Sequence, residues 1–199
     1  AAGVVIRLKN ETSKIICDGI LTLPLVLPPT VAGFFLLYLF GVKRPIGQFF
    51  IDFFGVKIAF SWGATVLAAV VMSVPLMYRS ARGAFEQVDP DLTAAARTLG
   101  MSEWEIFWKV LFANATPGIL SGGVLAFARG LGEFGATSMI AGNIAGKTRT
   151  LPMAVYSEVA AGNMGAADRY VAVIVVIAFI SILLMNLGAL RAGGRKHGA

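Results

Sequence analysis

Four long apolar runs dominate this sequence and restrict the folds that it can adopt. They cover about residues 15–40, 58–78, 116–141 and 170–190. A helix of roughly 20 residues, rising about 1.5 Å per residue, crosses the ~30 Å hydrocarbon core of a bilayer. Each run is therefore long enough to span a membrane. We predict an all-α integral membrane protein, a polytopic helical bundle with four full spans that forms one transmembrane domain over residues 1–199.

The composition agrees with this prediction. Hydrophobic residues make up 57% of the chain and charged residues 14%, whereas charged residues approach a quarter of a soluble domain. The single cysteine, Cys17, excludes an intrachain disulfide, and the one histidine, His197, lies in a basic tail, so we expect no metal site. The first ten residues read as the end of an apolar segment followed by a basic stretch. We therefore expect a further transmembrane helix to precede them.

Three prolines, Pro24, Pro28 and Pro29, interrupt the first apolar run. A straight helix facing lipid would leave carbonyls unpaired at each proline, so we expect a kinked segment packed against neighbours or a cavity. Thr30 follows the kink. Its hydroxyl, beside backbone groups freed by the break, is a candidate lining for an oxyanion path; a packed structural threonine is the alternative.

Arg129 and Glu133 lie within the third run, four residues apart and hence on one face of a helix. A charged side chain at the centre of a membrane helix costs roughly 2.5–3.5 kcal/mol on insertion scales. We therefore expect both groups to face a polar interior or each other. Two interpretations remain open: a structural ion pair, or the border of a pathway for a charged solute.

A polar stretch, Asp89 to Gly118, separates the second and third runs. Asp89 precedes a proline, which is the pattern of an N-cap followed by proline at the first helical position. Ser102 and Glu105 form the S-x-x-E pattern of a capping box, and Gly100 stands where a helix needs a left-handed C-terminal residue. The stretch is therefore predicted to be a short helix, a glycine elbow and a second short helix.

The third run itself begins with Thr116 and Pro117, which repeat the cap-then-proline pattern and predict a new helix there. Gly118 and Gly122 then form a G-x-x-x-G pattern, whose small residues allow close approach of two helix backbones. Residues 41–54, between the first two runs, read as a loop that contains a short amphipathic piece.

The basic residues predict the orientation of the chain in the membrane. Alternating spans place residues 1–14, 79–115 and the C-terminal tail on one side, with ten basic residues against six on the other. Those ten are Arg7, Lys9, Lys14, Arg79, Arg82, Arg97, Lys109, Arg191, Arg195 and Lys196. By the positive-inside rule, the polar stretch and the C-terminus are cytoplasmic. We therefore attribute the formal charge of +6 to the orientation of the chain in the membrane, and we predict no nucleic acid partner.

No catalytic motif was found in the sequence. It contains no phosphate-binding loop of the full G-x-x-x-x-G-K-S/T form, no H-E-x-x-H motif and no serine, histidine and aspartate set. We predict that the chain is not an enzyme. If the chain moves a solute against a gradient, the energy has to come from a partner protein or from coupling to an ion gradient. The helix, glycine and helix segment on the cytoplasmic side offers a docking surface, so we favour a partner protein.

The polar stretch resembles that of the membrane-spanning subunits of ABC importers that work with an extracytoplasmic binding protein. Their cytoplasmic loop has the form E-A-A-x-x-x-G, followed some nine residues later by an I-x-L-P-like stretch. The matching residues are Ala94–Gly100, Val110–Ala113 and Pro117–Leu120. Ala94 stands where the family has glutamate, and Phe112–Ala113 where it has Leu-Pro.

Three further stretches are similar to the molybdate, tungstate and sulfate branch of that family. They are Leu23–Val31 (LPLVLPPTV), Gly132–Thr137 (GEFGAT) and Thr148–Pro152 (TRTLP). Together with the cytoplasmic loop they cover nearly the whole chain and keep their order. Overall similarity favours molybdate or tungstate over sulfate.

The resemblance implies a permease subunit of an ATP-driven importer in the cell (inner or plasma) membrane. The partners it implies are a second copy of the chain, a dimer of ATP-binding cassette subunits on the cytoplasmic face, an extracytoplasmic oxyanion-binding protein, and membrane lipid. ATP and Mg²⁺ would be bound by the ATP-binding subunits, and no cofactor is expected in this chain. Residues 89–118 become the ATPase-coupling loop, with these site residues: Asp89, Ala94, Ala95, Ala96, Arg97, Gly100, Ser102, Glu105, Pro117 and Gly118. The candidate pathway residues are Thr30, Arg129, Glu133 and Thr137.

Three alternatives stay open at this point. A sulfate or thiosulfate permease of the same family would have the same architecture. A secondary transporter driven by an ion gradient would need a deep acidic residue, and Glu133, already beside Arg129, is the one candidate. A scaffold without transport would leave the kinked, glycine-rich and charged spans without a cavity to line.

Overall fold

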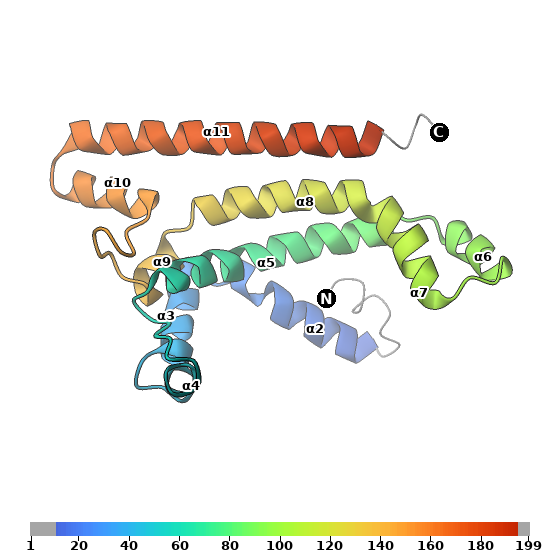
Figure 1. The fold of residues 1–199 in the computed structure, drawn as a ribbon, viewed down its shortest axis with the longest axis horizontal. Helices are drawn as coiled ribbons and strands as arrows, with labels where there is room; N and C mark the ends of the chain where they lie inside the picture. The colour runs from blue at the N-terminus through green and yellow to red at the C-terminus, as the bar shows by residue number, and fades with distance from the viewer. Residues whose placement is uncertain (1–10, 195–199) are drawn as a thin grey trace. The chain divides into compact units, whose positions relative to one another are not determined.

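The computed structural model describes residues 11–194, and all regular structure in that range is helical (Figure 1). Three helices are long and apolar enough to cross a membrane: α5 (Trp62–Glu86), the continuous helix Glu103–Leu131, and α11 (Met164–Gly194) over Met164–Gly188. A fourth span results if the bent pair α2 and α3 counts as one. The predicted all-α membrane protein is confirmed, whereas the expected helix before residue 1 lies outside the described residues.

The first predicted span consists of two helices, α2 (Glu11–Val26) and α3 (Pro29–Phe40), whose axes differ by 113°. Pro28 is extended, with φ −52° and ψ 136°, and Pro29 occupies the first turn of α3. Two consecutive residues without an N–H cannot continue a helix. The predicted kink is therefore confirmed, and it is a complete break.

The predicted helix start at Thr116 and Pro117 is wrong. One helix runs from the capping box to Leu131 through α7 (Glu103–Glu105), a π-helical segment η1 (Ile106–Phe112) and α8 (Ala113–Leu131). Pro117 lies inside it. In the turns just before the proline, Thr116 Oγ1 donates to the Phe112 carbonyl at 2.7 Å, and Asn114 Nδ2 donates to the Val110 carbonyl at 2.8 Å, so side chains add bonds to the backbone ladder there. This helix also ends well before Ala141.

Contacts divide the described chain into two compact units. The first comprises residues 11–22, 75–126 and 183–194, and the second comprises residues 23–74 and 127–182. Four helices, α2, α5, α8 and α11, contribute residues to both units. The prediction of a single domain therefore stays a prediction.

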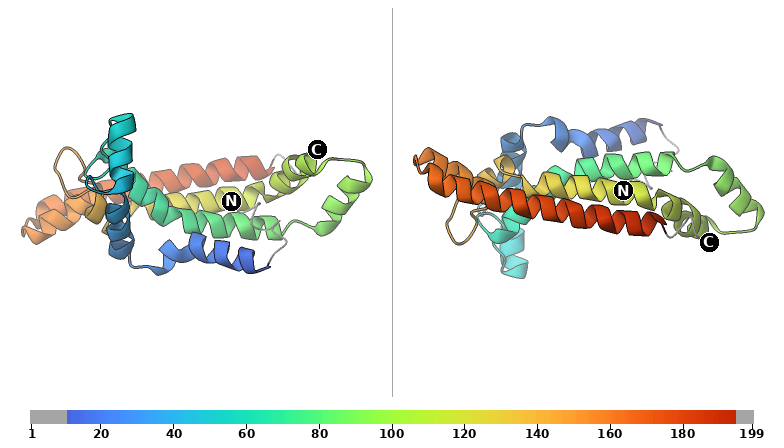
Figure 2. Two further views of the ribbon diagram at one scale, coloured as in Figure 1. Left: turned by 90° about the horizontal axis from the view of Figure 1, so that it is seen from below. Right: turned by 90° about the horizontal axis from the view of Figure 1, so that it is seen from above.

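In the first unit, the second half of α5 and the first half of α8 run side by side (Figure 2). A Cβ on Gly122 would lie 2.3 Å from Ser80 Cβ, and one on Gly118 would lie 2.6 Å from Ala84 Cβ. The two glycines thus face α5 at van der Waals distance. The close helix approach predicted from the G-x-x-x-G pattern is confirmed.

In the second unit, α3 packs against α9 (Gly135–Ile140). Gly33 lies against the Ala136 backbone, and Gly135 lies against Pro29. The buried core around this contact is built from small side chains and a few larger ones: Ala32, Leu36, Ala64, Ala68, Met72, Ala136, Ile140 and Ala141. This unit also contains α4 (Pro45–Phe54) and α10 (Leu151–Ala160).

Candidate functional site

The predicted coupling loop opens with helix α6 (Pro90–Thr98). Asp89 Oδ1 accepts a hydrogen bond from the Asp91 N–H at 2.9 Å, and Pro90 occupies the first helical position. A proline costs nothing at this position because its missing N–H would have no partner within the helix. The predicted N-cap is confirmed.

Helix α6 ends in the left-handed residue that the sequence predicted. Gly100 has a φ of +77°, its N–H donates to the Arg97 carbonyl at 3.0 Å, and the Met101 N–H donates to the Ala96 carbonyl at 3.2 Å. These paired bonds form a Schellman C-cap. A Cβ on residue 100 would meet nothing within 4 Å, so the backbone conformation, and not lack of space, favours glycine here.

The next helix starts at the predicted capping box. The Glu105 N–H donates to Ser102 Oγ at 3.3 Å, and the Ser102 N–H donates to Glu105 Oε2 at 3.2 Å. Lys109 Nζ pairs with Glu105 Oε1 at 2.8 Å one turn further on. The helix, elbow and helix arrangement is therefore fixed by bonds between near neighbours in the sequence.

One ion pair joins the two sides of the elbow. Arg97 Nε on α6 lies 2.7 Å from Glu103 Oε1 on α7, and this hydrogen bond to a carboxylate raises the pKa of Arg97 above its ordinary value. Both side chains are more than half exposed, so water competes with the pair. The pair links α6 to α7 across Gly100.

The loop surface carries apolar side chains that the sequence analysis overlooked. Leu99 is 80% exposed and Trp104 is 71% exposed, while Leu92 is 46% exposed. Of the three predicted alanines, Ala94 and Ala95 are exposed, whereas Ala96 is buried. Large apolar residues within a polar helical hairpin are the signal that could have identified them as a contact surface.

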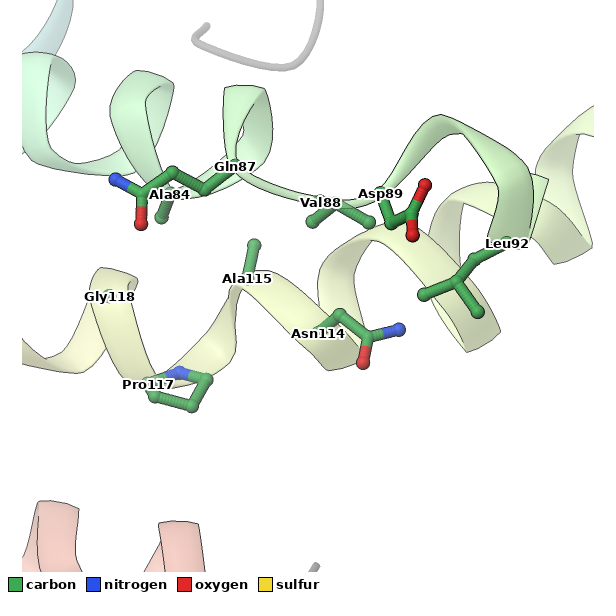
Figure 3. Close-up of a pocket in the computed structure, with 9 residues that line it drawn as sticks. All are labelled: Ala84, Gln87, Val88, Asp89, Leu92, Asn114, Ala115, Pro117 and Gly118. Carbon is green, nitrogen blue, oxygen red and sulfur yellow. The ribbon is translucent and has the colours of Figure 1, made fainter.

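A cavity of 340 Å³ lies between the end of α5, the start of α6 and the start of α8 (Figure 3). Asp89, Pro117 and Gly118 all line it, although the sequence placed them at opposite ends of the loop. Leu92 and Asn114 also point toward it in Figure 3. The structure thus brings both ends of the predicted coupling loop to one hollow.

Asp18 on α2 is bound by side chains of α5. Its carboxylate accepts hydrogen bonds from the Tyr78 hydroxyl and from Arg82, and Arg82 also pairs with Glu86 at 2.7 Å. The partners lie about sixty residues away in the chain, on α5, so no local pattern could have predicted them. This cluster ties α2 to α5 within the first unit.

In the second unit, Arg129 and Glu133 are paired, with Arg129 Nη1 2.8 Å from Glu133 Oε2. They do not share a helix, because Glu133 lies in the break after α8. The Glu133 side chain is 2% exposed, and its Oε1 accepts the Ala136 N–H at 2.7 Å, which caps the start of α9. The carboxylate is therefore bound on both oxygens.

Glu133 also lines a pocket of 260 Å³. Three hydroxyl side chains line it as well, Thr65 from α5, Thr137 from α9 and Thr150 from the loop before α10. Thr150 Oγ1 is buried and has no hydrogen-bond partner among residues 11–194. Sequence reasoning identified Thr137 but missed Thr65 and Thr150, because only tertiary packing brings them beside Glu133.

The three family-like stretches meet in this unit. Gly132–Thr137 and Thr148–Pro152 both line the pocket, and Gly135 packs against Pro29 and the Thr30 backbone of the first stretch. Thr30 itself is exposed and is not part of the pocket lining. Of the candidate pathway residues, the structure brings together Glu133, Thr137 and Arg129, the last through its ion pair.

A family model and several known proteins are similar to this chain. The family model for the binding-protein-dependent transport system inner membrane component matches residues 1–191. The molybdenum transport system permease protein ModB of Escherichia coli (strain K12) is 49% identical over 173 residues, which are 86% of this chain and 75% of that protein. The putative molybdenum transport system permease protein YvgM of Bacillus subtilis (strain 168) is 46% identical over 82% of this chain and 72% of its own length.

A sulfate permease and a solved transporter structure are similar to this chain at lower sequence identity. The sulfate transport system permease protein CysW of Synechocystis is 34% identical over 89% of this chain and 64% of its own length. The inward-facing MetNI methionine ABC transporter superposes with a TM-score of 0.69 at 16% identity, over 92% of this chain and 76% of that one. This last similarity concerns the fold alone.

Proposed function

Because the chain belongs to the family of binding-protein-dependent transport system inner membrane components, we propose that it is the permease subunit of an ATP-driven importer of molybdate or tungstate. It is a multi-pass membrane protein and a transport component. The observation that carries the choice of solute is the identity of 41–49% with molybdenum permeases, against 32–34% with sulfate permeases. Sulfate or thiosulfate import is the second candidate, since those relatives share the same family.

The energy enters through a separate subunit. In this proposal an ATP-binding cassette dimer binds ATP and Mg²⁺ and receives the elbow of residues 89–105 on the cytoplasmic side. Exposed Leu92, Leu99 and Trp104 offer the apolar contacts of such a docking surface. The Schellman cap, capping box and Arg97–Glu103 pair support a stiff loop. A stiff loop transmits a displacement to the helix that runs unbroken from residue 103 to Leu131.

The solute path is proposed to involve the hydroxyl-lined pocket of the second unit. Hydroxyls can donate hydrogen bonds to an oxyanion without adding charge, and Thr150 has a donor without a partner among the described residues. Glu133 would repel an anion if it stood alone. Arg129 and the Ala136 N–H balance that charge. High affinity is assigned to an extracytoplasmic binding protein, because a path that held its solute tightly could not release it.

The test is transport by the complete system. Two copies of this chain would be reconstituted with its ATP-binding subunit, and the solute-loaded binding protein added on the outer side. We expect ATP-dependent uptake of molybdate and tungstate, with sulfate taken up far more slowly. Preferred uptake of sulfate would establish the second candidate, and uptake driven by a proton gradient without ATP would contradict the proposal.

A further inference from the structure

Helix α4 (Pro45–Phe54) presents large apolar side chains outside the protein core. Phe53 is 74% exposed, Phe54 is 63% exposed and Phe49 is 48% exposed. The helix connects the end of α3 to the segment that leads into α5. It plays no part in the coupling loop or in the hydroxyl-lined pocket. An exposed aromatic surface of this kind indicates contact with another protein or with lipid.

One side of α4 is fixed against the end of α3. Gly47 is buried, and a Cβ at that position would lie 2.1 Å from the Gly41 carbonyl oxygen. Phe50, on the same side of the helix, contacts Phe40 with ring centroids 6.3 Å apart. The left-handed Gly55, with φ +64°, ends the helix. The orientation of α4 relative to α3 is therefore set by backbone contact.

The two remaining sides of α4 differ in polarity. With 100° per residue, Ile46, Phe49 and Phe53 fall on one flank, and all three are exposed. The exposed Gln48 and Asp52 fall on the other flank. Phe54, in the last turn, falls on the side of Gly47 and Phe50 and is exposed, with its ring centroid 5.7 Å from that of Phe50. The helix thus has a side bound to protein at Gly47 and Phe50, an apolar side and a polar side. This is the distribution required where protein, hydrocarbon and water meet.

The flanking residues match the level of lipid headgroups. Lys43 and Arg44 precede the helix and Lys57 follows it, all exposed, while Asp52 is the one acidic residue between them. The Arg44 guanidinium lies 4.0 Å from the centre of the Tyr38 ring at the end of α3, and the 71% exposed Trp62 begins α5. Tyrosine and tryptophan are enriched at this boundary of membrane proteins, and basic side chains attract phospholipid phosphates.

We propose that α4 is an interfacial helix that lies at the boundary between lipid headgroups and acyl chains, with Ile46, Phe49 and Phe53 in the hydrocarbon and Gln48 and Asp52 toward water. Lipid is favoured over a second copy of the chain because the exposed apolar flank is bordered on one side by polar residues and at both ends by basic residues. The interior of a protein interface is depleted of such charges. In this position α4 fixes the depth of α3 in the bilayer.

The test measures what touches each flank. In a Cys17→Ala background, which removes the single cysteine, Phe53→Cys and Gln48→Cys would each be labelled with the fluorophore NBD. The assembled transporter would be placed in nanodiscs of phosphatidylcholine and phosphatidylglycerol. Bromine-labelled acyl chains and aqueous iodide serve as the two quenchers. We expect the brominated chains to quench the label at residue 53 several-fold more than the label at residue 48, and iodide to show the reverse order.

Two results would overturn the proposal. Strong iodide quenching at residue 53 would place the apolar flank in water, and protection from both quenchers would place it against protein, such as a second copy. Phe49→Cys lies on the same flank and gives an independent measurement if the Phe53→Cys protein does not assemble. Because neither readout depends on the transported solute, a failure here is distinguishable from a failure of the proposed function.

Discussion

The elbow of residues 89–105 and the pocket around Glu133 are both polar, yet their polar groups are satisfied in different ways. In the elbow, each bond joins residues no more than six positions apart, and the side chains of its ion pair are more than half exposed. Around Glu133, the carboxylate is buried, and the pocket draws threonines from three separate segments. Water can replace a lost partner more readily in the exposed elbow than at the buried Glu133 carboxylate, so equal substitutions should have unequal costs.

The largest expected effect is at Glu133. Replacing it with alanine leaves the buried Ala136 N–H and the Arg129 guanidinium, whose side chain is 32% exposed, without their partner, and each unsatisfied group costs about 1–3 kcal/mol. Thermal unfolding in detergent should therefore shift strongly downward for Glu133→Ala. Glu103→Ala, which breaks the exposed pair with Arg97, is the matched control and should change little. Equal losses would refute the contrast between the two regions.

Exchanging the two charges sharpens the same comparison. If Arg129 and Glu133 bonded only to each other, Arg129→Glu combined with Glu133→Arg would restore the pair. Because Glu133 also accepts the Ala136 N–H, and arginine has no acceptor, we expect the double variant to remain unstable. Recovery of the wild-type melting temperature would show that the cap on α9 contributes nothing.

A second buried contact tests packing within the first unit. Gly122→Ala would place a Cβ 2.3 Å from Ser80 Cβ, whereas Gly123→Ala meets nothing within 4 Å. We expect a loss of about 1–3 kcal/mol for Gly122→Ala and no loss for Gly123→Ala, where alanine has the higher helix propensity. Measured unfolding of the two adjacent variants separates close packing from helix propensity.

Gly100 tests the elbow itself. A valine there has ample space but must adopt a left-handed backbone, at about 1–2 kcal/mol. We expect Gly100→Val to insert in the membrane and to hydrolyse ATP in the assembled transporter with little uptake, and Gly100→Asn to retain more coupling because asparagine tolerates this conformation. Normal uptake by the valine variant would contradict a coupling role for the elbow.

The smallest expected change in stability is at Thr150. Because its hydroxyl has no protein partner among the described residues, Thr150→Val should be neutral or stabilising by about 1 kcal/mol. Thr148→Val is the matched control, since Thr148 Oγ1 donates to the Gly142 carbonyl at 3.0 Å and accepts the Ile144 N–H at 3.1 Å. Reduced uptake by a stable Thr150→Val protein would place that hydroxyl on the solute path. A large loss of stability would mean that it has a structural partner.

The sequence by itself determined the membrane class, the break near Pro28, the close approach at Gly122 and every cap of the elbow. The caps were predictable because an N-cap, a capping box and a Schellman turn each satisfy backbone groups within a few residues. Local steric rules, which do not depend on the rest of the fold, are sufficient for such features.

Only the tertiary structure decided that the helix passes through Pro117, that α2 and α3 differ in direction by 113°, and that Glu133 caps α9. It also decided that Thr65 and Thr150 share a pocket with that carboxylate. The physical reason is the same in each case. A proline, a buried charge or a hydroxyl is tolerated only where some other group compensates for it, and packing supplies several of those groups from segments distant in the sequence.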